Sequence, residues 1–457
     1  MKRSHQIDMT QGALLPKIVM FSLPLLLTGV LQLMFNAADV MVVGKFAGSD
    51  CLAAVGSTGS LISLLVNVFV GISTGANVLC ARFYGSRDHD ALHKCVHCSI
   101  ALSIVMGILV GIWGAVMSRV LLQLMNVDPT VLPLSSLYLR IYFVGVPATV
   151  VYNFGAAILR ASGDTEHPLQ FLIISGVINV LLNIFLVVVC DMSVDGVAIA
   201  TAVSQYVSAF LVIRCLMKTT APHKLELKKV RFYRTYLIQI FRIGIPAGLQ
   251  STIFSISNVT IQSAVNSLGP VTMASTSAAS NLNSFIYISM NSLYHAALSF
   301  TSQNMGAKKK ERVKSVIGWC MLLVSIVGIV VGSLVYYFGP QLLSLYISAD
   351  DVNREAVIAT GMIVLGYWSR PYFIFGIMEV GAGIMRGLGK SWTPLLVSGI
   401  GICVLRVLWV HTIFAANPTL ETLYLSYPVS WVVSTTAMCL FLIPILWKLY
   451  RKEKAAA

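Results

Sequence analysis

Charged side chains are scarce in this chain of 457 residues. Only 11% of the residues are Asp, Glu, Lys or Arg, and 57% are hydrophobic, whereas soluble domains usually carry about 25% charged residues. So few charges cannot cover the surface of a water-soluble protein of this length, which excludes that class. The composition predicts a polytopic membrane protein.

The motifs of several other protein classes are also missing. Segments of alternating polarity, which build membrane barrels, are absent, and the nine cysteines show no framework spacing. In HDALHKCVHC (89–98) a helix would turn Cys95 away from the histidines, which argues against zinc. GLGKS (387–391) has Ile384 where a phosphate loop needs glycine. Without a His-Glu-x-x-His helix or paired aspartates, we expect neither an enzyme nor a cofactor.

What the sequence does contain is a series of long apolar runs. A helix needs about 20 residues to cross the hydrocarbon layer of a membrane. We therefore predict an all-α protein of twelve transmembrane helices, in two pseudo-symmetric six-helix lobes around a central cleft. The predicted spans are 14–42, 52–80, 95–118, 132–158, 168–190, 195–217, 237–265, 271–303, 313–338, 354–385, 392–414 and 423–447.

The positive charge of the chain follows the loops between these runs. Of the 32 Lys and Arg residues, 26 fall on the side of the two termini and three on the other side, while Arg140, Arg370 and Arg406 lie within spans. Cytoplasmic loops carry this excess, so both termini are predicted to be cytoplasmic, in the plasma membrane. The net charge of +14 then needs no nucleic-acid partner.

The chain contains an internal repeat. GAAILRASGDTEHP (155–168) matches GAGIMRGLGKSWTP (381–394), and Pro24 and Pro246 occupy matching places in the first and seventh spans. Two halves that enter from the same side are typical of transporters that rock around a midplane site. We predict an N-terminal lobe at 1–222, a loop at 223–236 and a C-terminal lobe at 237–457.

An aspartate interrupts the first apolar run, in QLMFNAADVMVVG (32–44). Helical spacing places Gln32, Asn36 and Asp39 on one face, and intramembrane acids usually serve a function. The fifth and sixth spans add polar stripes, namely Ser175, Asn179, Asn183 and Thr201, Gln205, Ser208.

This set of side chains suits a small cation. A proton fits because burial disfavours a charged carboxylate, and Na⁺ fits because carboxylate, amide and hydroxyl oxygens can surround it. No metal other than Na⁺ at Asp39 is expected. The alternative is that Asp39 pairs structurally with a neighbouring amide or with Arg140, and that the asparagines hold helices together.

Four motifs carry a resemblance to a known family: the pattern from Pro24 to Gly44, YNFGAAILRASGDTEHP (152–168), NVLLN (179–183) and GVAIAT (196–201). Over its whole length the chain resembles the multidrug and toxic compound extrusion (MATE) family. The resemblance implies ion-coupled export of amphipathic, often cationic compounds. It places a cation-coupling site at Asp39, Asn153, Asn179, Asn183 and Thr201. Some members carry a second acid at the position of Asn183, so its absence leaves H⁺ and Na⁺ both open.

The substrate cleft is predicted from polar residues of both halves. Glu379 would draw organic cations into the cleft, or alternatively would pair with Arg370. The remaining residues are either cleft walls or interhelical hydrogen bonds. They are Gln32, Asn36, Gln205, Asn258, Gln262, Tyr287 and Asn291.

We therefore predict a monomeric antiporter for small amphipathic molecules in the lipid bilayer. The rival is a related flippase or exporter of lipid-linked or polyanionic precursors, which needs basic residues inside its cleft. Arg140 and Arg406 lie near enough to the outer ends of their spans to snorkel, which disfavours the rival.

Overall fold

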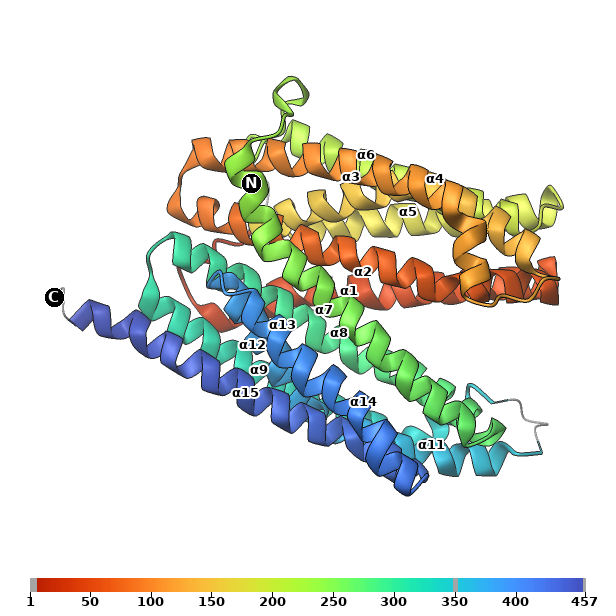
Figure 1. Cartoon of the computed structure of the whole chain (residues 1–457). Helices are drawn as coiled ribbons and strands as arrows, with labels where there is room; N and C mark the ends of the chain where they lie inside the picture. Colours follow the sequence, from red (N-terminus) through yellow and green to blue (C-terminus); the bar gives the residue numbers. More distant parts are fainter. Residues whose placement is uncertain (1–5, 348–351, 455–457) are drawn as a thin grey trace. The chain divides into compact units, whose positions relative to one another are not determined.

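The computed structural model describes residues 6–347 and 352–454 of the chain, and within these ranges it contains helices and no strand (Figure 1). The chain divides into two compact units. Unit 1 comprises the residues up to Asp8 together with Leu23–Gly248, and unit 2 comprises Met9–Ser22 and the residues from Leu249 onward. The prediction of an all-helical protein is confirmed.

Unit 1 is built around α4, which packs against α2, α3 and α6, and Figure 1 shows α3, α4 and α6 side by side. Two helices are extended by short π-helical segments, η1 after α1 and η2 after α5. The elements are α1 Leu14–Val42, η1 Val43–Ala47, α2 Ser49–Ser86, α3 His89–Leu124, α4 Leu132–Ala161, α5 Glu166–Ile184, η2 Phe185–Val189, α6 Val194–Lys218, the 3₁₀ turn η3 Leu227–Lys229 and α7 Arg234–Ser267.

Glycines bring α3 and α4 into close contact. A Cβ atom on Gly107 would lie 2.7 Å from Pro147 Cα, and one on Gly114 would lie 2.0 Å from the ring of Phe143. Small residues at such spacing let the backbones of membrane helices approach each other. The packing of α3 on α4 therefore depends on this glycine stripe.

Unit 2 is built around α12, which packs against α8, α9 and α15. Its elements, after the second part of α7, are α8 Pro270–Gly306, α9 Lys310–Tyr337, α10 Gly339–Ser344, α11 Arg354–Ser369, α12 Tyr372–Gly387, α13 Trp392–Ser398, η4 Gly399–Val404, α14 Leu405–Trp409, η5 Val410–Phe414 and α15 Leu420–Lys454.

The helices agree with most of the predicted spans. Ten helical segments of the described chain are long and apolar enough to cross a membrane, and they match ten of the twelve predicted spans. The predicted span 271–303 is one helix, α8, that is rich in Ser, Thr and Asn. The prediction of one continuous span at 354–385 is wrong, because α11 ends at Ser369 and α12 begins at Tyr372. Pro371 lacks the N–H that would continue the helical hydrogen bonds.

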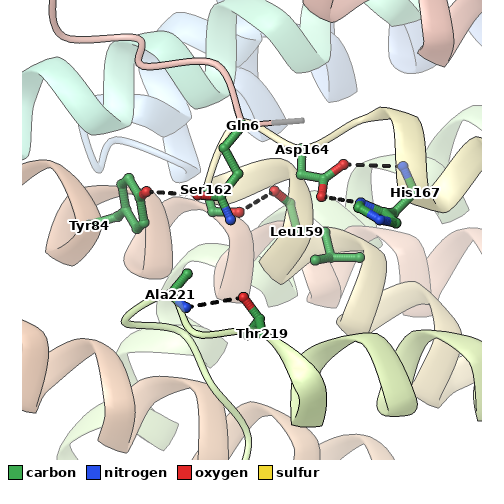
Figure 2. A network of polar contacts seen from close by, with 8 residues as sticks. All are labelled: Gln6, Tyr84, Leu159, Ser162, Asp164, His167, Thr219 and Ala221. Atoms are coloured by element: carbon green, nitrogen blue, oxygen red, sulfur yellow. Dashed lines mark hydrogen bonds and ion pairs between the residues drawn. The ribbon is translucent and has the colours of Figure 1, made fainter. Parts of the chain in front are cut away.

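Local polar contacts stabilise the turn between α4 and α5 and, separately, the start of the connector 219–233 in unit 1 (Figure 2). Asp164 accepts hydrogen bonds from the backbone N–H of His167 at 3.1 Å and from its Nδ1 at 2.5 Å. The ring of His223 is buried beside the ring of Tyr84, and the hydroxyl of Tyr84 donates to Gln6 at 3.4 Å. Burial lowers the pKa of His223 to about 4, although the charge of Asp164 acts in the opposite direction.

Candidate functional site

The polar site of unit 1 lies where α1 and α5 touch. Gly176 faces the ring of Phe35, and a Cβ atom at this position would lie only 2.0 Å from Phe35 Cε2. Asp39 follows Phe35 by one helical turn, and Asn183 follows Gly176 by two turns on the same face. The close approach at Gly176 therefore brings Asp39 opposite Asn183.

A chain of hydrogen bonds runs from Asp39 across α5 to α6. Asn183 Nδ2 donates to Asp39 Oδ1 at 2.5 Å and to Asn179 Oδ1 at 3.3 Å. Asn179 Nδ2 in turn donates to Thr201 Oγ1 at 3.5 Å. Asn183 is fully buried, and its Oδ1 has no hydrogen-bond partner. The structure thus joins four of the five predicted cation-coupling residues and leaves one buried oxygen beside the carboxylate.

The fifth predicted residue, Asn153, does not join this chain, because its Nδ2 donates to Thr149 O in its own helix at 2.9 Å. Gln205 packs its side-chain oxygen against Gly145, and Gln32 and Asn36 are exposed on α1. The pairing of Asp39 with Arg140 that we considered is not observed, since Arg140 Nε donates to Ser118 at 3.3 Å.

Tyr138 of α4 is a neighbour of Asp39 that the sequence did not predict. It is 7% exposed and lies close enough to Asp39 for the two side chains to interact electrostatically. Tyr138 belongs to an apolar cluster that includes residues of η1 and η2, and Asp39 beside it is partly buried. The cluster consists of Val43, Cys51, Ala54, Tyr138, Val187, Val194, Val197 and Ala198. Tyr138 stands in an apolar run without polar periodicity, so no sequence signal singles it out.

The polar residues of unit 2 gather between α8 and α12. Glu379 is 8% exposed and Arg386, predicted to begin a loop, is 5% exposed within α12. Arg386 donates hydrogen bonds to the Tyr294 hydroxyl oxygen and to Gln250 Oε1. The alternative pairing of Glu379 with Arg370 is wrong, because Arg370 stacks at 4.0 Å from the ring centre of Tyr336 and is exposed.

The other predicted cleft residues of unit 2 separate into two groups. Asn291 Nδ2 donates to the Tyr287 hydroxyl at 3.2 Å, and Tyr287 lies near enough to Glu379 to interact with its charge. Asn258 and Gln262 are exposed on α7, where Gln262 Nε2 donates to Asn266 at 2.9 Å. Only the first group belongs with Glu379.

Arg406 does not snorkel, contrary to the sequence-based expectation. It is 4% exposed, stacks at 3.8 Å from the ring centre of Tyr427 and donates from Nε to Ser430 at 2.9 Å. Its helix is π-helical on both sides, at η4 and η5. The ring of Tyr427 and the hydroxyl of Ser430 hold it inside the unit.

The histidines that suggested a metal site serve the connector instead. His97 Nε2 accepts the backbone N–H of Glu226 at 3.0 Å, and His93 lies 3.4 Å from the Glu226 carboxylate. Among the residues that the structure describes, no group of three or more His, Cys, Asp or Glu side chains has the arrangement of a metal site.

Comparisons with known proteins agree with this arrangement. The family model MatE matches the chain in two segments, residues 24–185 and 246–410, which begin at the two prolines of the internal repeat. The chain is 29% identical to the probable multidrug resistance protein YoeA of Bacillus subtilis over 91% of this chain and 90% of that protein. It is 22% identical to the multidrug export protein MepA of Staphylococcus aureus over 85% of both chains.

The fold has close counterparts among solved structures. The outward-facing conformation of a multidrug resistance MATE family transporter of the MOP superfamily superimposes with a TM-score of 0.90 at 20% identity, over 99% of this chain and all of that one. The two matched segments together cover more than half of the sequence. The chain therefore belongs to the MatE family and is a multi-pass membrane protein of the multidrug efflux transporters, not an enzyme.

Proposed function

We propose that the protein is a cation-coupled antiporter that exports amphipathic, often cationic compounds by alternating access. The observation that carries this proposal is the hydrogen-bonded chain from Asp39 through Asn183 and Asn179 to Thr201. A partly buried carboxylate at the end of a row of neutral amides is an arrangement that binds and releases a small cation.

The orientation of Asn183 suggests how the ion is received. Its N–H group now donates to Asp39, and its buried oxygen has no donor. When H⁺ or Na⁺ neutralises the carboxylate, rotation of the amide presents this oxygen to the ion or to the new O–H group. A hydrogen bond to a charged group contributes about 1.5–3 kcal/mol, which is enough to shift two conformations that differ by a few kcal/mol.

The setting of this transport follows from the sequence. We propose two lobes of six helices, residues 1–222 and 237–457, joined by the loop 223–236, in the plasma membrane with both termini cytoplasmic. The protein would act as a monomer and without a cofactor, on small molecules that reach it from the cytoplasm or the bilayer. The excess of Lys and Arg on one side supports this topology.

Uptake into inverted membrane vesicles tests the proposal. A fluorescent amphipathic cation is offered while either a pH gradient or a Na⁺ gradient is imposed, and Asp39→Asn is compared with the wild type. We expect uptake under one gradient and its loss in the variant, with normal amounts of folded protein. Full gradient-driven uptake by Asp39→Asn would refute the assignment.

A second candidate is the export of lipid-linked or polyanionic precursors. It is favoured by one observation, the burial of Arg386 and Arg406 within unit 2. In the same vesicles, movement of a labelled anionic lipid without any uptake of the cation would support it.

A further inference from the structure

Two opposite charges lie on one face of α12 without forming an ion pair, although the charge of Arg386 acts on Glu379. Glu379 and Arg386 are seven residues apart, which corresponds to two helical turns and about 10 Å along the axis. Glu379 and Arg386 are 8% and 5% exposed, yet no ion pair of either is found in the part of the chain that the structure describes. Buried charges are costly unless they are paired.

The guanidinium of Arg386 has only neutral partners. It donates to the Tyr294 hydroxyl and to Gln250 Oε1, and it lies 5.4 Å from the ring centre of Tyr294. Its Nε is buried and has no hydrogen-bond partner. An unused N–H on a buried cation is a ready donor to a carboxylate, the geometry that guanidinium groups recognise best.

Glu379 is surrounded by aromatic side chains. Its charge is sensed by Tyr287 and Tyr372, and it accepts no hydrogen bond from any described residue. Tyr287 is 42% exposed, and its ring centre lies 6.3 Å from that of Phe375, with the two rings tilted at 42°. A carboxylate beside an accessible aromatic ring is a setting that attracts an organic cation.

The packing of α8 fixes the two charges in place. Gly383 stands one turn after Glu379 and three residues before Arg386, and a Cβ atom there would lie 2.8 Å from Tyr294 O. This contact keeps Tyr294 beside Arg386, and Tyr287, seven residues earlier on the same face of α8, beside Glu379.

We propose that Glu379 and Arg386 together recognise zwitterionic amphiphiles. Glu379 takes the cationic group, Arg386 Nε takes the carboxylate, and the ring system of the ligand lies along Tyr287. A simple cation gains only the contact with Glu379 and is repelled by Arg386. This inference rests on the proposed transport function, because it assumes that unit 2 contributes to substrate binding.

A pair of matched dyes tests the proposal on the purified full-length protein in detergent. One dye is a rhodamine methyl ester, a cation, and the other is its free acid, a zwitterion. Fluorescence anisotropy measures the Kd of each. In the wild type we expect the acid to bind more tightly. Arg386→Gln should weaken binding of the acid by about tenfold, equivalent to about 1.4 kcal/mol, and leave binding of the ester unchanged or tighter.

The control is Arg370→Gln, which removes an exposed arginine stacked on an aromatic ring of the same unit, and should change neither Kd. Glu379→Gln should weaken the binding of both dyes. If Arg386→Gln does not fold, Arg386→Lys keeps the charge and should retain part of the preference for the acid. An equal loss of affinity for both dyes in a folded Arg386 variant, or no loss of affinity for either dye, would overturn the proposal.

The same experiment separates this inference from the proposed function. Binding in detergent needs no ion gradient, so Asp39→Asn should leave the ratio of the two Kd values unchanged. Should Asp39→Asn retain gradient-driven uptake, the coupling assignment fails while the dye preference stands. If Asp39→Asn abolishes uptake but the wild type shows no dye preference, the inference about zwitterions fails while the coupling assignment stands.

Discussion

The two units share a repeat but carry the acid of their predicted site in different places. Asp39 lies 15 residues after Pro24, and the residue 15 positions after Pro246 is Ile261, which is 4% exposed. Conversely, Glu379 lies two residues before Gly381, and the residue two before Gly155 is Asn153. The acid of unit 1 is thus on its first helix, and that of unit 2 is on its fourth span.

This difference in position changes what each acid can do. Asp39 faces a chain of amides that reorient without changing charge, whereas Glu379 shares its helix face with a guanidinium. Asn153, the counterpart of Glu379, uses its amide within its own helix. We infer that unit 1 is specialised for a small ion and unit 2 for an organic ligand.

The strongest test of this division is to remove each acid separately. Asp39→Asn should reduce gradient-driven uptake by about 100-fold or more, because the step that links ion and conformation is lost, while dye binding in detergent persists. Glu379→Gln should reduce dye affinity by about tenfold and leave the remaining uptake dependent on the gradient. Parallel uptake and anisotropy measurements decide this, and a similar loss of both properties in each variant would contradict the division.

A second prediction concerns two of the three asparagines that the family resemblance assigned to the same site. Asn183→Ala removes the donor to Asp39 and should shift the ion concentration for half-maximal uptake by about tenfold, since hydrogen bonds to charged groups contribute about 1.5–3 kcal/mol. Asn153→Ala removes only a bond within α4 and should change this concentration less than twofold. Titration of uptake against the driving ion distinguishes them. Equal shifts would place Asn153 in the site after all.

Much of unit 1 could be predicted from helical periodicity. Asp39, Asn179, Asn183 and Thr201 lie on helix faces that the sequence marks by spacing alone, and the structure joins them. Periodicity gives the face of a residue but not the partner of its side chain, so it could not show that Asn153 bonds within its own helix.

Unit 2 was harder to predict, because its decisive residue lies at the end of an apolar run. Arg386 marks the border of a predicted loop by composition, but α12 continues to Gly387 and packing on α8 buries the side chain. Its partners are Gln250 of α7 and Tyr294 of α8, and neither is among the predicted cleft residues of these helices, Asn258, Gln262, Tyr287 and Asn291. Periodicity therefore indicated the two helices, and on α8 the correct face through Tyr287, but not the side chains that contact Arg386.

The third prediction compares the close helix contacts that position the two sites. Gly176→Ala would drive a methyl group into Phe35, and Gly383→Ala would drive one into Tyr294, so each should destabilise its unit by about 1–3 kcal/mol. Gly176→Ala should mainly alter the ion dependence of uptake, and Gly383→Ala the ratio of the two dye affinities. Thermal unfolding with these two assays checks the pair. Loss of stability without either specific effect would show that the contacts support the fold alone.

The smallest expected effect is a pH dependence confined to the connector of unit 1. His223 has a pKa of about 4 in the folded protein because it is buried, below the usual value near 6.5, so its neutral form stabilises the docked connector. That stabilisation is complete above about pH 6.5 and is lost as the pH falls toward 4, by at most about 3 kcal/mol.

The charge of Asp164 reduces this loss and Tyr84 contributes only its ring. The Leu225 N–H donates to Leu216 O at 2.9 Å, and its protection against hydrogen exchange, corrected for the intrinsic pH dependence of amide exchange, should therefore fall at low pH. His223→Phe should reduce the pH dependence of this exchange at Leu225. The remaining dependence is the part due to His97, whose hydrogen bond from the Glu226 N–H is lost on protonation. An unchanged slope in His223→Phe would mean that another group controls the docking of the connector, and that unit 1 responds to protons at its ion site and not here.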